Sequence, residues 1–300
     1  MQFKKIFCSL LITLLSIIFL TSVIYSLLIV NKEANWSLLF KGLFPLCLAA
    51  VVIALTYRSI LPNWNINLTI SSYLNLKFIV LITVIPILNT ILFQPIARSL
   101  HYNLAKVATL NSVQELKAFE KPAFLEVEDW YVDRMQVIPI NTIKPLSAIT
   151  FGKVEQKVLL LVPIFNRDDA YKSNAKAWLA FVYQKTLTAE EAKPANYVEF
   201  LNSSITHFKR MNIADFSYLE AYPRGENYDI LYEMAKVHTF YKSGFDNIYK
   251  GQYVDRDTLA IYYLKYSLFF FLIVGLLAIL LISLLLHYVA NKQPNQELPV

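Results

Sequence analysis

The sequence predicts an α-helical membrane protein with four transmembrane helices and one α+β extramembrane domain between the third and fourth spans. Apolar residues make up 56% of the chain and charged residues only 17%, whereas soluble proteins carry about 25% charged residues. Residues 98–265 hold 20 of the 22 acidic and 21 of the 28 basic residues. The predicted organisation is therefore a three-helix membrane region at 1–97, the domain at 98–265, a fourth transmembrane helix at 266–290 and a short polar tail at 291–300.

Four segments contain no Asp, Glu, Lys or Arg, and they are Ile6–Val30, Gly42–Tyr57, Phe78–Ala97 and Tyr266–Ala290. About 20 helical residues cross a bilayer core, because a helix rises about 1.5 Å per residue. The second segment reaches this length only if Lys41 extends its amine to the membrane interface. The first is longer than the apolar core of a signal peptide, so we expect a retained anchor.

Basic residues in the short segments predict the orientation. Four spans place both termini on one side of the membrane and the domain on the other. Five basic residues lie on the terminal side and two on the opposite side: Lys4, Lys5, Arg58, Lys77 and Lys292 against Lys32 and Lys41. Cytoplasmic short loops are enriched in Lys and Arg, so we expect cytoplasmic termini and a domain outside the cytoplasm.

The first part of the domain predicts a short helix and two strands. Ser112 and Glu115 form a capping box, which predicts a helix that ends at about Phe119. Residue types that favour strands predict two of them, at Ala123–Val127 and Trp130–Ile138.

The middle of the domain predicts two long strands. Lys157–Phe165 is almost wholly apolar, which is typical of a buried central strand. Ala177–Thr188 predicts a second strand, joined to the first by a polar, hairpin-like connection at 166–174. Alternation places Trp178, Ala180, Val182 and Gln184 on one face of that strand.

The last part of the domain predicts two helices around a strand. A capping box of Thr188 and Glu191 precedes Pro194 and an apolar stripe at helical spacing. The stripe consists of Tyr197, Phe200, Leu201, Ile205 and Phe208. A strand is expected at Phe216–Tyr222 and a second helix at Tyr228–Tyr241, with the inward residues Ile230, Leu231, Met234 and Val237.

The sequence predicts no catalytic, cofactor-binding or metal-binding residues. Two cysteines and four scattered histidines lack the clustering that metal ligands show. Phosphate-binding glycine motifs and the G-x-S-x-G motif do not occur. The 98–265 block has a net charge of only +1, which disfavours nucleic-acid binding.

Four residues remain as weak acid–base candidates: Glu126, Asp129, Asp133 and His101. Paired carboxylates can exchange protons when their surroundings separate their pKa values. The alternative interpretation is the solvated face of an edge strand, where charges oppose aggregation. We expect this second role for the carboxylates.

Several residues are expected to act within the membrane region. Tyr262, Tyr263 and Tyr266, together with Lys41, fit a membrane interface in contact with lipid, although the tyrosines also suit a partner-binding surface. Asn89 and Gln94 suit polar contacts between helices. Their alternative role is a transport path.

The domain resembles a known module. The strand Lys176–Lys185 (KAWLAFVYQK), the helix Phe200–Phe208 and the segment Phe216–Glu220 (FSYLE) resemble the extramembrane module of some Bacteroidetes rhomboid-family membrane proteins, over about residues 110–240. The rhomboid G-x-S-G serine motif and its histidine partner are not in this sequence, and two of the usual six core spans are missing. The resemblance therefore implies no catalytic residue. It implies a bacterial envelope module that serves membrane partners.

The favoured hypothesis is a non-enzymatic bacterial inner-membrane protein whose periplasmic domain binds another envelope protein as a scaffold, adaptor or sensor. One alternative is a membrane hydrolase or a regulator of an intramembrane protease. Another is a small transporter subunit built around Asn89 and Gln94. The sequence leaves the partner and the oligomeric state open.

Overall fold

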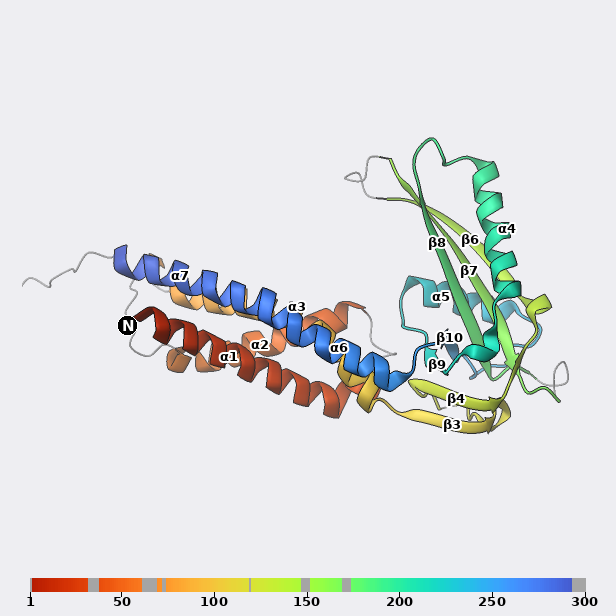
Figure 1. Cartoon of the computed structure of the whole chain (residues 1–300), viewed down its shortest axis with the longest axis horizontal. Coiled ribbons are helices and arrows are strands. Elements are labelled where there is room, and N and C mark those ends of the chain that lie inside the picture. The colour runs from red at the N-terminus through yellow and green to blue at the C-terminus, as the bar shows by residue number, and fades with distance from the viewer. Residues whose placement is uncertain are drawn as a thin grey trace, which may run out of the picture. The chain divides into compact units, whose positions relative to one another are not determined.

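The computed structural model describes residues 2–31, 38–60, 69–71, 74–118, 120–146, 152–168 and 174–292 (Figure 1). The chain forms two compact units. A helical unit comprises Met1–Val30, Ser37–Ala105 and Arg256–Val300, and an α/β unit comprises Asn31–Trp36 and Lys106–Asp255.

The described part of the helical unit contains four long apolar helical segments. They are α1 (Gln2–Ile24) with a π-helical turn Tyr25–Ile29, α2 (Leu38–Ile60), α3 (Leu76–Leu104), and α6 (Arg256–Phe270) continued by a π-helical turn Phe271–Gly275 and α7 (Leu276–Lys292). Among the described residues, three stretches are long and apolar enough to cross a membrane, Phe3–Ile29, Phe78–Leu104 and Arg256–Tyr288. These three predicted spans thus have helices of spanning length. The second predicted span lies on α2, whose described apolar stretch Lys41–Thr56 is shorter, so the count of four spans stays a prediction.

Two short strands, β1 (Thr69–Ser71) and β2 (Leu74–Asn75), form an antiparallel pair before α3. Two of the uncharged segments are shorter than the helices that contain them. The helix that contains Phe78–Ala97, α3, continues to Leu104, and the helix that leads into Tyr266–Ala290, α6, already begins at Arg256.

The helical unit is apolar both inside and outside. Its core joins one stripe from each long helix, for example Leu10, Ile53, Leu88 and Ile279. Its outer surface exposes other large apolar side chains, including Phe19 at 71%. Water would oppose such a surface, whereas lipid tails solvate it.

The α/β unit is built on an eight-stranded mixed sheet in the order β3-β4-β9-β10-β8-β7-β5, with β6 also paired to β7. The β3–β4 and β10–β8 pairs are parallel. The strands are β3 (Val107–Ser112), β4 (Phe124–Asp129), β5 (Tyr131–Val132), β6 (Ile138–Pro145), β7 (Val154–Phe165), β8 (Ala177–Leu187), β9 (Tyr218–Ala221) and β10 (Ile248–Gln252).

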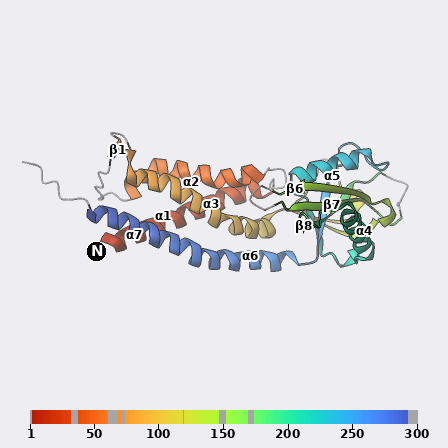
Figure 2. The ribbon, with the colours of Figure 1, turned by 90° about the horizontal axis from the view of Figure 1, so that it is seen from above.

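Helices α4 (Pro194–Arg210) and α5 (Glu226–Val237) cover opposite faces of this sheet (Figure 2). On β7, Leu160 packs in the cluster that contains Phe208 of α4, while Leu161 packs in the cluster that contains Leu231 of α5. Because both faces are covered, β7 is apolar at consecutive positions rather than at alternate ones. The prediction of a buried central strand is confirmed.

The predicted alternation of the next strand is also confirmed. In β8, Trp178 and Ala180 belong to the cluster on the α5 face, whereas Ala177 and Leu179 belong to the cluster on the α4 face. Residues 169–173 of the predicted connection lie outside the described residues.

The helix predicted from the Ser112 capping box is wrong. Only a 3-10 turn, Val113–Glu115, forms there, and the Ser112 hydroxyl accepts from the Gln114 amide. Residues up to Ser112 instead form β3, because they pair with β4. Tertiary pairing therefore overrides the local helix signal. Phe119 lies outside the described residues.

The strand predicted at Trp130–Ile138 is mostly wrong. Only β5 forms within it, followed by the 3-10 turn Arg134–Gln136. The polar side chain of Asp133 accepts from the Met135 amide, and this local bond competes with strand pairing.

The helix predicted after the Thr188 capping box forms, with Pro194 in its first turn. Thr188 and Glu191 make the reciprocal bonds of a capping box, but the box closes a turn, and α4 begins at Pro194. The carboxylate accepts from the Thr188 amide and hydroxyl, which lowers the pKa of Glu191.

The second predicted helix ends early. α5 stops at Val237, and that side chain is 81% exposed rather than buried. Leu231 and Met234 are buried as expected, and Tyr228 and Ala235 complete the inward face.

The strands β3, β6 and β10 had no sequence prediction, because their short mixed stretches lack a strong alternation.

Candidate interaction surfaces

The acid–base candidates do not form one cluster among the described residues. Glu126 and Asp129 lie on β4, and Asp129 faces Arg167 with 3.5 Å between carboxylate and guanidinium. His101 lies on the last turn of α3, in the other unit, with its ring edge against Tyr102.

The edge strand expected for these carboxylates is wrong, because β4 pairs with both β3 and β9, and Asp133 is buried at the start of a turn. The contact with Arg167 gives Asp129 a structural role. The catalytic role of the four candidates stays a prediction.

Asp133 begins a feature that links several elements of the α/β unit. It is 4% exposed, and its carboxylate accepts from the Met135 amide at 2.9 Å, which caps the 3-10 turn that follows. We name residues Asp133–Gln136 the clasp. The cap fixes the backbone of the clasp, so the side chains and carbonyls that follow have defined directions.

Arg134 joins the clasp to α4. Its guanidinium donates to the main-chain carbonyls of Lys209 and Met211, the latter at 2.6 Å. The last carbonyls of a helix have no partner within the helix and carry its negative end. A guanidinium therefore satisfies both the hydrogen bonds and the charge at this end of α4.

Gln136 joins the clasp to the end of α5. The Nε2 atom of His238 lies 3.3 Å from the Gln136 carbonyl, and its Nδ1 atom accepts from the Phe240 amide at 3.2 Å. These two contacts assign the proton to Nε2. Burial lowers the pKa of His238, and the hydrogen bond to Gln136 opposes this effect only in part.

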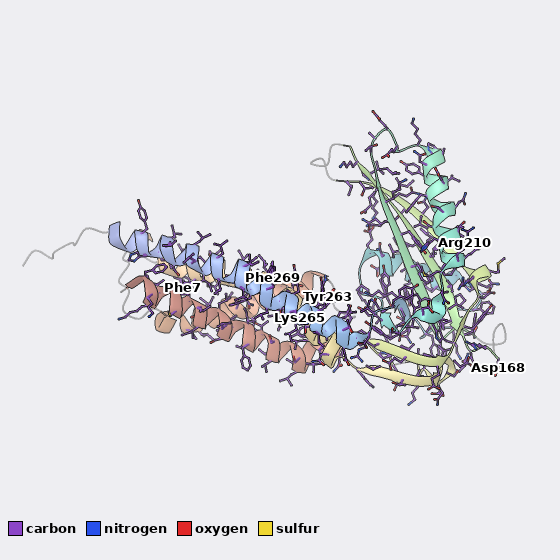
Figure 3. The ribbon with its side chains drawn as sticks, viewed as in Figure 1. Phe7, Asp168, Arg210, Tyr263, Lys265 and Phe269 are labelled. Atoms are coloured by element: carbon purple, nitrogen blue, oxygen red, sulfur yellow. The ribbon has the colours of Figure 1, made fainter. Side chains whose placement is uncertain are left out.

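The clasp thus brings the C-terminal ends of α4 and α5 to one edge of the sheet, where large apolar side chains are exposed. Met135 in the clasp is 78% exposed and Val237 beside His238 is 81% exposed. Lys209 and Arg210 lie exposed on the last turn of α4, without an ion pair to any residue that the structure describes. Figure 3 labels Arg210 on this helix. We name Met135, Val237, Lys209 and Arg210 the clasp surface.

A small pocket lies elsewhere on the α/β unit, where β9 leads into α5. Its volume is about 30 Å³, which is room for only a few water molecules. Lys121 and Asp246 on its wall form an ion pair at 2.6 Å, and Arg224 lies over the Tyr228 ring. Burial raises the pKa of Tyr228 to about 12. Its charges are already paired or stacked, so the pocket offers little for a ligand.

The predicted interface tyrosines lie together on α6 of the helical unit. Tyr262 and Tyr266 stack on one another with ring centroids 6.4 Å apart, and both are exposed. Tyr263 stacks on Tyr102 of α3, and the Arg98 guanidinium lies 5.4 Å from the Tyr263 ring (Figure 3). Aromatic rings beside a cation are typical of a membrane interface. Lys41 is half-buried on α2.

The two predicted amides of α3 have opposite surroundings. Asn89 is fully buried and donates to the Pro45 carbonyl of α2 at 3.0 Å. Gln94 is exposed and makes no hydrogen bond with any described residue. One amide therefore links two helices, and the other lies on the outer surface of the unit.

No family model, curated protein or solved structure matches this chain. The described residues contain no group of three or more His, Cys, Asp or Glu side chains that could hold a metal ion. The interpretation of function therefore depends on the two units themselves.

The sequence analysis missed the clasp surface. Arg134 and Met135 fell within a predicted strand, and Val237 within a predicted buried stripe. A signal was present, since Asp133 can cap a following turn as readily as it can occupy a strand. The ends of α4 and α5 come to the same edge of the sheet only in the folded unit. The spacing of residues in the sequence does not show this.

Proposed function

We propose that this chain is a non-enzymatic, four-span protein of a bacterial inner membrane whose α/β unit lies in the periplasm and binds another envelope protein. The observation that carries the proposal is the clasp surface, which consists of the exposed apolar side chains of Met135 and Val237 and two cations, Lys209 and Arg210, that have no ion pair with a described residue. Hydrogen bonds from the clasp to the ends of α4 and α5 connect these positions.

The membrane placement is supported by length and by charge. With 23 residues, α2 is about 35 Å long, which exceeds the roughly 30 Å of a hydrocarbon core. Four spans place the α/β unit opposite both termini. The basic residues of the short loops then favour cytoplasmic termini. The resemblance of residues 110–240 to a rhomboid-associated module supports an envelope location.

The composition of the clasp surface supports protein binding. Methionine is enriched at the centre of protein interfaces because its flexible, polarisable chain adapts to a partner. Exposed cations around an apolar centre increase the rate of encounter with an acidic surface. The expected partner therefore presents an apolar patch with acidic residues at its border.

Pull-down from membranes tests this proposal. Met135→Glu and Val237→Glu place a charge in the proposed contact, and the exposure of both side chains predicts little effect on folding. Each should remove the partner that co-purifies with the full chain. Val198→Glu on α4, where Val198 is 56% exposed, is the matched control and should retain it. Retention by all three variants would contradict the proposal.

A further inference from the structure

Helix α3 has a second stripe of residues that faces away from the helical unit. Leu81, Ile85, Leu88 and Leu92 pack in the core of the unit. Alternating steps of three and four residues connect the exposed positions on the other side: Val84, Ile87, Ile91, Gln94 and Arg98. This spacing of 3.5 residues is that of a left-handed helix–helix seam.

Gln94 distinguishes this stripe from ordinary lipid-facing surface. It lies three residues, or about 4.5 Å, from the middle of the Phe78–Leu104 stretch, so its amide would be within the hydrocarbon core. An amide without hydrogen bonds is costly there.

Several hydroxyl groups of the helices avoid this cost within the chain. The Thr83 hydroxyl donates to the Ile79 carbonyl of its own helix, and the Thr56 hydroxyl does the same with Val52. The Gln94 amide has no such bond.

We propose that this stripe binds the same stripe of a second copy of the chain, so that two α3 helices form a parallel pair about a two-fold axis along the membrane normal. The inference depends on the proposed spanning of the membrane by α3. Membrane insertion gives both copies the same direction and depth, so Gln94 of one copy meets Gln94 of the other. An amide both donates and accepts, so the two side chains satisfy one another.

The neighbouring residues fit this arrangement. Val84, Ile87 and Ile91 are β-branched, and β-branched side chains have few rotamers to lose on packing. Arg98 is held on the Tyr263 ring, with a hydrogen bond of 3.3 Å to its hydroxyl, which draws its charge toward α6. The other three uncharged segments contain no Asn or Gln.

Disulfide cross-linking in membranes tests the pair. The full chain would carry Cys8→Ser and Cys47→Ser, with Ile91→Cys as the reporter at the centre of the stripe. Ile12→Cys, on the outer face of α1 where Ile12 is 64% exposed, is the matched control. Mild oxidation should give a covalent dimer from position 91 and not from position 12. Equal cross-linking from both positions would indicate random collision and overturn the proposal.

Adding Gln94→Leu to the Ile91→Cys chain tests the role of the amide. The dimer association constant should fall by about tenfold, the effect of a hydrogen bond between membrane helices. An unchanged yield would overturn the proposal. Alkaline extraction of the same membranes separates the two hypotheses. A chain released from the membrane contradicts the spanning helix, whereas a retained chain that does not cross-link contradicts only the pair.

Discussion

The two units place apolar side chains in opposite ways. In the α/β unit the largest apolar residues are inside, and Trp178 at the centre of the sheet is fully buried. In the helical unit apolar residues lie on both sides, with Leu10 fully buried and Phe19 and Leu27 more than 70% exposed. The comparison teaches that the surrounding solvent determines which apolar side chains must be buried. Water drives apolar side chains into the core of the α/β unit, whereas lipid permits them on the outer surface of the helical unit.

The units also differ in how they satisfy polar groups. Most hydrogen-bonded hydroxyls of the helical unit donate to their own helix, as Thr21 does to the Ile17 carbonyl at 2.7 Å. In the α/β unit side chains bond across elements, and Gln156 of β7 donates to the Tyr197 carbonyl of α4. A hydroxyl bond within a helix needs no neighbour and therefore suits lipid. The bonds across elements make the α/β unit sensitive to single substitutions.

The largest expected effect sharpens this difference in burial. Trp178→Ala should lower the free energy of unfolding of the α/β unit by about 3–5 kcal/mol, because it leaves a cavity beneath α5. Phe19→Ala, at an exposed site of the helical unit, should cost less than about 1 kcal/mol in detergent. Calorimetry of the purified full chain measures both. Similar losses from the two variants would contradict the assignment of lipid and water faces.

A second prediction concerns close packing in the α/β unit. A Cβ atom on Gly251 of β10 would overlap the ring of Phe216. Gly251→Ala should therefore destabilise the unit by about 1–3 kcal/mol. Combining it with Phe216→Ala should remove most of the added cost, because the two substitutions are coupled. Strictly additive effects in this double-mutant cycle would show that the ring does not lie on the glycine.

A third prediction concerns the clasp. Arg134→Ala should cost about 1–2 kcal/mol, because two carbonyls at the end of α4 lose a charged donor. Lys209→Ala is the control, since the Lys209 contact with Arg134 is through its carbonyl and survives the substitution. Urea unfolding of the full chain compares the two. An equal loss from both variants would indicate that the charges, rather than the hydrogen bonds, stabilise this edge.

The smallest effect is a dependence on pH. The pKa of His238 is lowered in the folded state by burial, so the unfolded chain takes up the proton first as the pH falls. Stability from this residue is therefore present above about pH 6.5 and declines below it. His238→Gln should reduce the change in the free energy of unfolding between about pH 5 and 7, which urea unfolding at several pH values measures. If the free energy of unfolding of the variant changed with pH as much as that of the original chain, His238 would not be the source of the pH dependence.

The sequence predicts the strongly patterned elements well and the short ones poorly. The uncharged segments on α1, α3 and α6–α7 and the buried strand β7 follow from long runs of one residue class. Met135 and Val237 could not be placed, because their exposure follows from where α5 ends and how the clasp turns. Asn89 makes the predicted contact between helices, whereas Gln94 makes none with any described residue, because its direction depends on which face of α3 packs on the other helices.

The most direct test of the account is the side of the membrane on which the α/β unit lies. Lys193, exposed just before α4, can be replaced by cysteine in a chain that carries Cys8→Ser and Cys47→Ser. Intact cells with a permeabilised outer membrane would then be treated with a membrane-impermeant thiol reagent. The account predicts labelling before lysis, equal to that after lysis. Labelling only after lysis would place the unit in the cytoplasm and contradict the proposed function.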